Sequence, residues 1–343
     1  MVGKTGVLIV NLGTPDSPSV PDVRKYLREF LMDGRVIDIP AVPRWALINL
    51  IIAPFRAPKS AKIYKELWTE RGSPLKFYGE DNEKQLQAAL GDEYIVKLAM
   101  RYQSPSIELG LKAFQRMGLN NIIVIPFFPQ YASASTGSVY EEVMRVITKW
   151  QVIPEIKIHN YFYNKPKFIK AFADNGRKHL EKYNYEHVLF SYHGLPERHM
   201  RKGDCTGEVC KLGSCCDAIH KMNQHCYRAQ CFETTRLLVK ELGLKEGTYT
   251  TSFQSRLGKD PWVKPYTDDA IKDLTKRGIK SVLAYSPAFV SDCLETTIEV
   301  AEEYKEIFEE NGGEYWQLVE SLNDSVAWID ILVDLVKEKS LQK

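Results

Sequence analysis

Two stretches of this sequence indicate its fold, HVLFSYHGLPERH (187–199) and SVLAYSPAFVSDCLET (281–296). Each begins with a short apolar run of the kind that forms a buried parallel strand and then continues into a polar motif. In an open parallel sheet, ligands bind at the carboxyl ends of the strands. The two motifs place His193 after the first run and Glu295 after the second. An imidazole and a carboxylate that face one cleft can handle a metal ion and protons together.

Short strand-like runs alternate with amphipathic helical patterns along the whole chain. Helical patterns such as 106–118 and 138–150 separate the runs of the first half, and patterns such as 233–243 and 268–278 separate those of the second. The strand-like runs are 7–13, 94–102, 122–128 and 155–162, followed by 188–194, 249–255 and 281–289. This alternation predicts an α/β fold of two similar doubly wound, Rossmann-like domains, each with a parallel four-stranded sheet.

We place the two domains at residues 1–165 and 166–343. The final helical pattern, 325–339, belongs to the second half by its place in the sequence, and the alternative is that it packs back on the first half. Between two domains of this kind, the interdomain cleft is the default place for a ligand.

The composition excludes some classes of function. The chain has 343 residues, of which 44% are hydrophobic, and 46 Lys and Arg stand against 44 Asp and Glu, so the net charge is only +2. A nucleic-acid partner is therefore not expected, because there is no basic excess to neutralise phosphates. No apolar run reaches 18 residues, and the first residues lead directly into a strand rather than a signal peptide. We expect a cytoplasmic protein.

One apolar stretch, WALINLIIAPF (45–55), carries no charge before Arg56. It predicts either a buried helix or an exposed apolar lip. An exposed lip could hold a flat apolar ligand or make peripheral contact with the inner face of a membrane.

Six of the seven cysteines crowd into one segment, 205–231. In a reducing compartment such a group indicates a metal or iron–sulfur site before a disulfide framework. The candidate ligands of a [2Fe–2S] cluster are Cys205, Cys210, Cys215 and Cys216, with Cys226 able to replace one of the last two because adjacent ligands are geometrically awkward. Zinc would accept the same set, and disulfides or free thiols remain a further alternative.

Taken in order, the motifs resemble ferrochelatase, the enzyme family that inserts ferrous iron into a porphyrin. The resemblance covers nearly the whole chain and implies the two-domain chelatase fold. It rests on NLGTPDSP (11–18), APFRAPKSAKIY (53–64), PFFPQYASASTGS (126–138), SYHGLPERH (191–199), FQSRLGKDPWVKPYTDDAI (253–271) and SPAFVSDCLET (286–296).

The resemblance implies roles for particular residues. His193 matches the histidine that takes pyrrole protons or holds the metal, and Glu295 matches the carboxylate opposite it. Both are therefore candidate ligands of the ferrous substrate. Other matches lie near the metal side of the pocket (Arg101, Tyr102), near the porphyrin and its propionates (Arg56, Lys59, Tyr64) or along the cleft (Tyr131, Ser133, Ser255, Trp262).

Structural explanations compete with some of these roles. An acid such as Glu295 in a first helical turn is favoured by the helix dipole alone. Arg56 and Lys59 fit a plain surface face as well as a propionate site, for which guanidinium groups are suited. The later acids Glu299, Glu302, Glu303 and Glu306 fit a solvated face or a proton relay.

The resemblance also has departures. Some members carry a histidine where this chain has Cys293, and some carry a cluster-ligating cysteine where it has Ser133. The function that it implies is the insertion of ferrous iron into protoporphyrin IX or coproporphyrin III, with loss of two protons, at the end of haem biosynthesis. The alternatives are a cobalt or nickel tetrapyrrole chelatase and a non-catalytic porphyrin or haem carrier.

Overall fold

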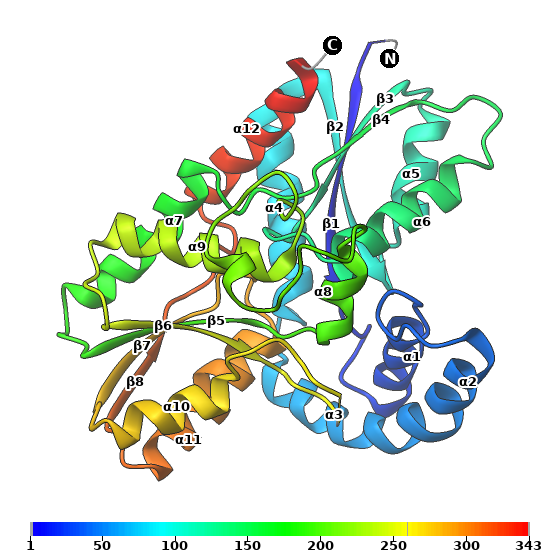
Figure 1. Cartoon of the computed structure of the whole chain (residues 1–343). Helices are drawn as coiled ribbons and strands as arrows, with labels where there is room; N and C mark the ends of the chain where they lie inside the picture. Colours follow the sequence, from blue (N-terminus) through cyan, green and yellow to red (C-terminus); the bar gives the residue numbers. More distant parts are fainter. Residues whose placement is uncertain (1–2, 259, 342–343) are drawn as a thin grey trace. The chain divides into compact units, whose positions relative to one another are not determined.

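A computed structural model describes residues 3–258 and 260–341 and divides the chain into two compact units (Figure 1). The first unit comprises the described residues up to Phe128, Ser133–Asn160 and the described residues from Asp324 onward, and the second comprises Pro129–Ala132 and Tyr161–Asn323. Each unit is thus made of more than one stretch of the chain, whereas the predicted domains, 1–165 and 166–343, are each continuous. Met1, Val2, Lys259, Gln342 and Lys343, which fall inside the predicted domains, lie outside the described residues.

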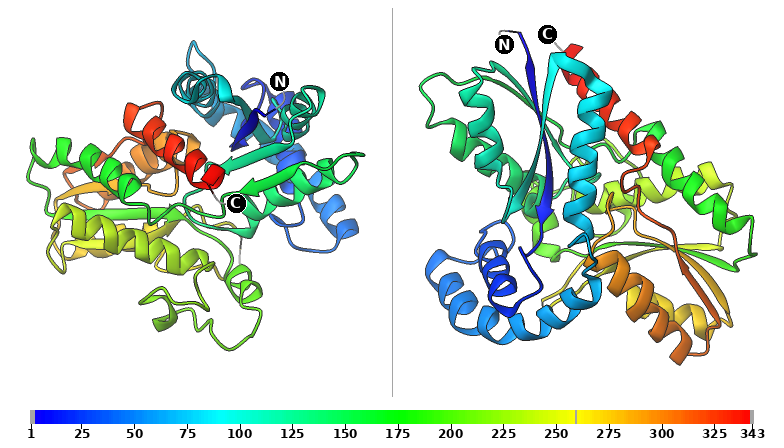
Figure 2. Two further views of the ribbon diagram at one scale, coloured as in Figure 1. Left: turned by 90° about the horizontal axis from the view of Figure 1, so that it is seen from above. Right: turned by 180° about the vertical axis from the view of Figure 1, so that it is seen from behind.

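The first unit is built on a four-stranded parallel sheet in the order β2-β1-β3-β4. Helices α4 and α12 pack on one face of the sheet, and α5 and α6 pack on the other (Figure 2). The strands are β1 (Thr5–Gly13), β2 (Tyr94–Tyr102), β3 (Asn121–Pro126) and β4 (Glu155–Ile158). The helical elements are α1 (Val20–Leu31), α2 (Ala41–Ala46), η1 (Leu47–Ile52), α3 (Ala53–Leu67), α4 (Pro74–Leu90), η2 (Gly91–Glu93), α5 (Ile107–Arg116), η3 (Ser133–Gly137), α6 (Ser138–Ile147) and α12 (Val326–Leu341).

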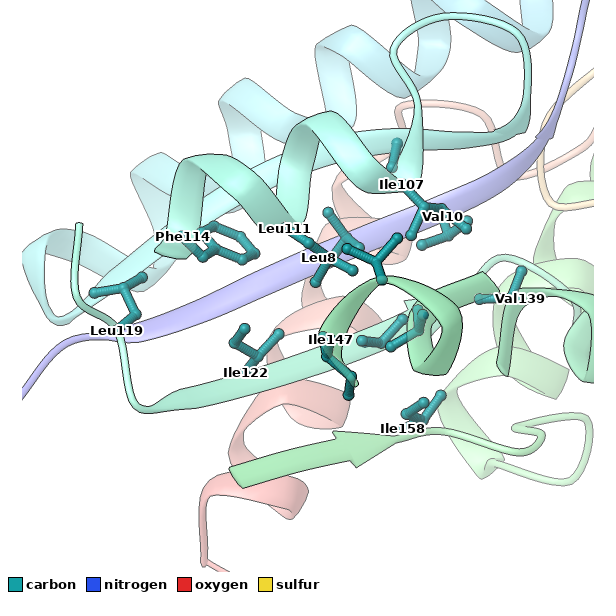
Figure 3. Packing of buried hydrophobic residues seen from close by; sticks show 14 residues of the cluster. Leu8, Val10, Ile107, Leu111, Phe114, Leu119, Ile122, Val139, Ile147 and Ile158 are labelled. Atoms are coloured by element: carbon teal, nitrogen blue, oxygen red, sulfur yellow. The ribbon is translucent and has the colours of Figure 1, made fainter. Parts of the chain in front are cut away.

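The core between this sheet and helices α5 and α6 follows from the sequence pattern (Figure 3). Leu8 and Val10 are inward-facing residues of β1, and Leu111 and Phe114 lie on the apolar face of α5. A short turn separates β2 from α5, and at its end the Ser106 hydroxyl accepts a hydrogen bond from the Leu109 N–H at 3.2 Å. This N-cap fixes where the helix begins.

The second unit repeats the plan with the strand order β6-β5-β7-β8. Helices α7 and α9 pack against each other on one face, and α10 packs with α11 on the other (Figure 1). The strands are β5 (His187–His193), β6 (Tyr249–Gln254), β7 (Ser281–Tyr285) and β8 (Tyr315–Leu318). The helical elements are α7 (Pro166–Leu180), α8 (Glu197–Gly203), η4 (Ser214–Cys216), α9 (Tyr227–Leu242), α10 (Thr267–Lys276), η5 (Glu295–Glu303) and α11 (Tyr304–Glu310).

The two units match in detail as well as in strand order. After β2 the chain turns back so that the Met100 N–H donates to the Pro105 carbonyl at 2.6 Å, and after β6 the Phe253 N–H donates to the Pro265 carbonyl at 2.8 Å. The predicted fold class, two similar doubly wound α/β domains with parallel four-stranded sheets, is confirmed.

Element η5 is a π-helix, whose turns are wider than those of an α-helix. The Val300 side chain in its middle belongs to the apolar core of the second unit. The Val300 carbonyl accepts a hydrogen bond from the indole N–H of Trp316 in β8, at 2.8 Å. The π-helix is therefore anchored on the sheet by both its apolar face and its backbone.

Candidate active site

His193 is the last residue of β5, and its neighbours hold its ring in one orientation. The Nδ1–H donates to the carbonyl of Gly194 at 2.6 Å, which leaves Nε2 with its lone pair for a proton or a metal ion. The next residue must be glycine, because a Cβ at Gly194 would lie only 2.7 Å from the carbonyl oxygen of Gln254. The rings of Trp262 and Phe289 flank the imidazole, with centroids 6.4 and 6.5 Å away.

Gln254 connects this strand end to the acidic π-helix. It ends β6 and pairs in register with His193, and its side chain is buried. The Ser191 hydroxyl donates to Oε1 at 2.8 Å and so fixes the orientation of the amide. The Nε2 group then donates at 2.9 Å both to the Glu295 main-chain carbonyl and to a carboxylate oxygen of Glu299.

Sequence reasoning missed Gln254. A signal for it was present, because YTTSFQS ends a predicted strand with a glutamine at the position that meets His193 on the neighbouring strand. A buried amide at such a place needs partners for its donors and its acceptor, and these are the site groups.

Two carboxylates lie near the start of η5. Glu295 is its first residue and is half-buried, and Glu299 follows one turn later. The Ser255 hydroxyl donates to Glu299 at 2.5 Å, and the Tyr304 hydroxyl donates to its other oxygen at 3.0 Å. Glu302, Glu303 and Glu306 are exposed. The inner end of this acidic row is therefore held in place by hydrogen bonds.

Cys293 lies two residues before Glu295 and is buried. Burial raises the pKa of its thiol well above the ordinary value, and the charge and hydrogen bond of Glu295 raise it further. The thiol therefore stays protonated.

The loops that follow β5 and β6 are fastened to each other. The Val263 N–H donates to the Leu195 carbonyl, and the Glu197 N–H donates to the Pro261 carbonyl, both at 2.9 Å. Ser255 has a φ of 63°, which serine adopts rarely, and this turn accompanies its bond to Glu299. Trp262 is buried, and its indole N–H finds no partner among the described residues.

Tyr131 lies in a short piece of the second unit that α9 holds. Its N–H donates to the side-chain oxygen of Gln230 at 2.6 Å, and its ring packs edge-on against His225 with centroids 5.8 Å apart.

Arg101 and Tyr102, at the end of β2, share one carboxylate in the first unit. The Arg101 guanidinium and the Tyr102 hydroxyl each donate to Asp33 at 2.8 Å. Burial acts to raise the pKa of Asp33, but hydrogen bonds, led by that from Ser138, outweigh it and the pKa stays below its ordinary value. Burial, helped by the Asp33 charge, raises the pKa of Tyr102 well above its ordinary range.

Similar sequences occur among known proteins. The chain matches the family model described as Ferrochelatase over residues 4–340. It is 46% identical over 336 residues to a protein of Legionella pneumophila named ferrochelatase, covering 98% of this chain and 99% of that one. It is 43% identical over 339 residues to a Coxiella burnetii protein of the same name, covering 99% and 94%.

This chain belongs to the ferrochelatase family. The predicted family is thereby confirmed, and with it the enzyme class, a metal chelatase, and the reaction, insertion of iron into a porphyrin in haem biosynthesis.

The fold has a solved counterpart. The structure of SirB from Bacillus subtilis with Fe3+ superimposes with a TM-score of 0.55 at 13% identity, covering 98% of this chain and 96% of that one. A second structure, of the sirohydrochlorin chelatase SirB in complex with cobalt, gives a TM-score of 0.52 at 12% identity. At these identities the likeness shows the fold alone.

The remaining residues that the ferrochelatase resemblance singled out lie mostly on α3. Arg56 and Lys59 are exposed and one turn apart, so they share a face. Tyr64 is buried, with its ring edge-on to Tyr26 at a centroid distance of 6.2 Å. Ser133 begins η3 and accepts a hydrogen bond from Arg35 at 3.0 Å. The structure thus groups most of the site residues as one set around Gln254, a pair on Asp33 and a set on α3, whereas Tyr131 contacts Gln230 and His225, and Ser133 contacts Arg35.

The stretch 45–55 has an exposed apolar face, as the second of its two interpretations requires, while part of it is buried. Five large apolar side chains of α2, η1 and the start of α3 point to solvent, and we call them the apolar lip: Val42, Trp45, Leu50, Ile51 and Phe55. Phe55 is 74% exposed and Leu50 60%, whereas Ile48 is fully buried and fastens the segment to the first unit. Among the described residues, no helix is long and apolar enough to cross a membrane.

The cysteine-rich segment forms the irregular connection between α8 and α9 (Figure 2). The sulfur atoms of Cys215 and Cys216 are 3.9 Å apart, and the Cys216 thiol hydrogen-bonds to Cys226. That bond lowers the pKa of Cys226, whereas burial raises the pKa of Cys210. Cys205 is exposed. Within residues 3–258 and 260–341, no three His, Cys, Asp or Glu side chains already stand as the ligands of a metal ion.

Proposed function

We propose that this chain inserts ferrous iron into protoporphyrin IX or coproporphyrin III with His193 and Glu295 as the groups that act on metal and protons. The observation that carries the proposal is the hydrogen-bonded line across the strand ends of the second unit. In it, Nδ1 of His193 is engaged by Gly194, so Nε2 is available, and Gln254 ties the adjacent strand to Glu295 and Glu299.

The chemistry of the substrate explains why both groups are needed. A porphyrin must lose two N–H protons as iron enters, and its lone pairs point inward while the ring is flat. Binding that bends the ring exposes those lone pairs, which is a use of binding energy to approach the transition state. The imidazole and the carboxylate then divide proton removal and metal delivery, and ferrous iron accepts either as a ligand.

Metal preference tests this function against that of a cobalt or nickel chelatase. We expect anaerobic assays with Fe²⁺, Co²⁺ and Ni²⁺ to give the highest kcat/KM for Fe²⁺ with a porphyrin. The same assays with protoporphyrin IX and coproporphyrin III, which carry two and four propionates, identify the substrate. A clear preference for a sirohydrochlorin-type ring with cobalt or nickel would contradict the proposal.

The apolar lip supports a second element of the proposal, peripheral contact with the cytoplasmic face of a membrane. Its side chains are exposed on consecutive turns and are followed by the exposed cations Arg56 and Lys59. Apolar residues beside basic ones are the pattern that places a helix in the interface of an anionic bilayer. Such contact would suit an enzyme whose substrate and product are both poorly soluble in water.

We expect the double substitution Leu50→Ser, Ile51→Ser to weaken binding to anionic phospholipid vesicles about tenfold or more, because two apolar side chains no longer leave water. Co-sedimentation with vesicles measures the effect. The matched control is Val152→Ser, Ile153→Ser, since those residues are 72% and 58% exposed beside 60% and 56% for the lip pair. Equal loss in both double variants, or no binding by the parent, would refute a membrane role for the lip.

The thiol segment supports a third element, a [2Fe–2S] cluster whose four ligands come from Cys205, Cys210, Cys215, Cys216 and Cys226. Four thiolates are the ligand set of such a cluster, the sulfur atoms of Cys215 and Cys216 are 3.9 Å apart, and the Cys216 thiol hydrogen-bonds to Cys226. When bound, the cluster would supply a redox-active, cross-linking centre. The cysteines would hold it and so order a segment with little apolar core of its own.

Cys210→Ser is expected to bleach the visible absorption of anaerobically purified protein and to remove about two irons per chain, because one thiolate ligand is lost. Cys231→Ala is the comparison and should keep both the colour and the iron, because Cys231 is buried inside α9 and is not a candidate ligand. Absorption spectra and metal analysis measure these outcomes. A colourless parent without iron or zinc, or loss of the cluster in Cys231→Ala alone, would show that the ligand set is wrong.

A further inference from the structure

Helix α9 begins at Tyr227, directly after Cys226, and Tyr227 reaches the main chain of the active-site histidine. The Tyr227 hydroxyl is buried with its ring and donates to the carbonyl oxygen of His193 at 2.8 Å. This contact lies within the second unit.

The bond acts on one particular peptide group, the one that joins His193 to Gly194. Its carbonyl oxygen is held by Tyr227, and its N–H donates to the Gln254 carbonyl at 2.8 Å. Both polar atoms of a single peptide plane are thus fixed. The residue that follows is a glycine, which would otherwise rotate easily. Because the Gly194 carbonyl is the acceptor for Nδ1 of His193, rotation there would also turn the imidazole.

We propose that Tyr227 is a positioning residue for His193, and that Cys226 affects the reaction through it. The inference rests on the proposed role of His193. The thiol segment and Tyr227 are continuous, since Cys226 is the residue before the helix and its carbonyl accepts the N–H of Gln230 in the first turn. The segment is also fastened to the same helix where Arg236 donates to the Cys216 carbonyl at 3.2 Å.

A neighbouring tyrosine, Tyr192, provides a comparison that distinguishes a positioning role of Tyr227 from a role in core packing alone. Tyr192 precedes His193 in β5 and is fully buried, and its hydroxyl bonds to Thr235 of the same helix at 3.0 Å. Removing either hydroxyl therefore breaks a buried hydrogen bond between α9 and β5. Of the two hydroxyls, only that of Tyr227 hydrogen-bonds to the peptide group between His193 and Gly194.

The first test compares Tyr227→Phe with Tyr192→Phe. We expect Tyr227→Phe to lower kcat about tenfold with the KM for porphyrin unchanged. A small misplacement of the His193 imidazole raises the free energy of the transition state but leaves the apolar contacts that bind the porphyrin. Tyr192→Phe should keep kcat within about twofold of the parent at a similar loss of thermal stability. Parental kcat in Tyr227→Phe, or equal loss of kcat in both variants, would overturn the positioning role.

The second test is a double-mutant cycle between Cys226→Ser and Tyr227→Phe. If Cys226 acts through Tyr227, the serine substitution lowers kcat in the parent but lowers it no further in a chain that already carries Tyr227→Phe. Thermal unfolding of each variant, with Cys205→Ser alongside, verifies that the chains remain folded. No loss in Cys226→Ser, or losses that multiply in the double variant, would overturn the link to the thiol segment.

The role of His193 itself is distinguished by His193→Ala. If that variant keeps its activity, the proposed function of His193 fails and Tyr227 has no group to position. If His193→Ala is inactive while Tyr227→Phe equals the parent, only the inference on Tyr227 fails.

Discussion

His193→Ala should reduce the insertion of ferrous iron by a factor of about 10² to 10⁴ while porphyrin still binds. The substitution removes the Nε2 lone pair, which the bond from Nδ1 to Gly194 leaves available for a proton or the metal. The flanking rings of Trp262 and Phe289 remain as apolar surface. Anaerobic turnover measures the first effect, and the quenching of protein fluorescence by porphyrin measures the second.

His199→Ala is the matched control, because it removes the next imidazole along the chain, in α8. It should turn over like the parent. If His193→Ala keeps activity within about threefold of the parent, His193 is not an acid–base group or metal ligand of the reaction.

Glu295→Gln should lower turnover about 10²-fold or more with little change in the free energy of unfolding. The amide keeps the shape of the side chain and can still accept the hydrogen bond of the Cys293 thiol, but it loses the charge that attracts protons or iron. The fold is preserved because Gln254 bonds to the main-chain carbonyl of Glu295 and not to its carboxylate. Steady-state kinetics and urea unfolding measure the two properties.

Glu302→Gln, an exposed acid of the same π-helix, serves as the control and should leave turnover intact. Unfolding of Glu295→Gln under conditions where the control is folded would mean that Glu295 is a structural residue at the start of the helix.

The same two variants separate the tasks of the pair. A variant that loses a metal ligand should show a raised KM for Fe²⁺, whereas a variant that loses a proton acceptor should show a lowered kcat at unchanged KM for Fe²⁺.

Much of the fold follows from sequence because apolar runs bounded by turn residues are reliable signals of buried strands. The run 94–102 coincides with β2, and seven of the eight strands overlap predicted runs. Strand β8, YWQL, was not recognised individually, since it has only four residues and Tyr315 is exposed. That α12 belongs with the first unit depends on tertiary packing against α4 and β3, which local sequence does not encode.

The sequence identifies candidate site residues where a motif follows a strand. It does not identify a geometry that depends on hydrogen-bond partners elsewhere in the chain. His193 and Glu295 stand in such motifs, but the π-helical form of η5 did not follow from its apolar spacing, which a slightly wider turn leaves almost unchanged. Gln254 and Tyr227 form hydrogen bonds to main-chain groups distant in sequence, and residue type alone does not identify these partners, even though the position of Gln254 near a strand end is a signal. For the stretch 45–55, apolar composition alone left burial undecided, and the exposure of Leu50 and Phe55 resolves it.

The most direct test of the central claim is the anaerobic addition of ferrous iron to a small amount of the purified protein with an excess of free porphyrin. The account predicts that the free-base spectrum converts to that of the metalloporphyrin over many turnovers, and that His193→Ala and Glu295→Gln bind the porphyrin and leave it as the free base. A parent protein that binds porphyrin but leaves it metal-free would be a carrier and would contradict the account.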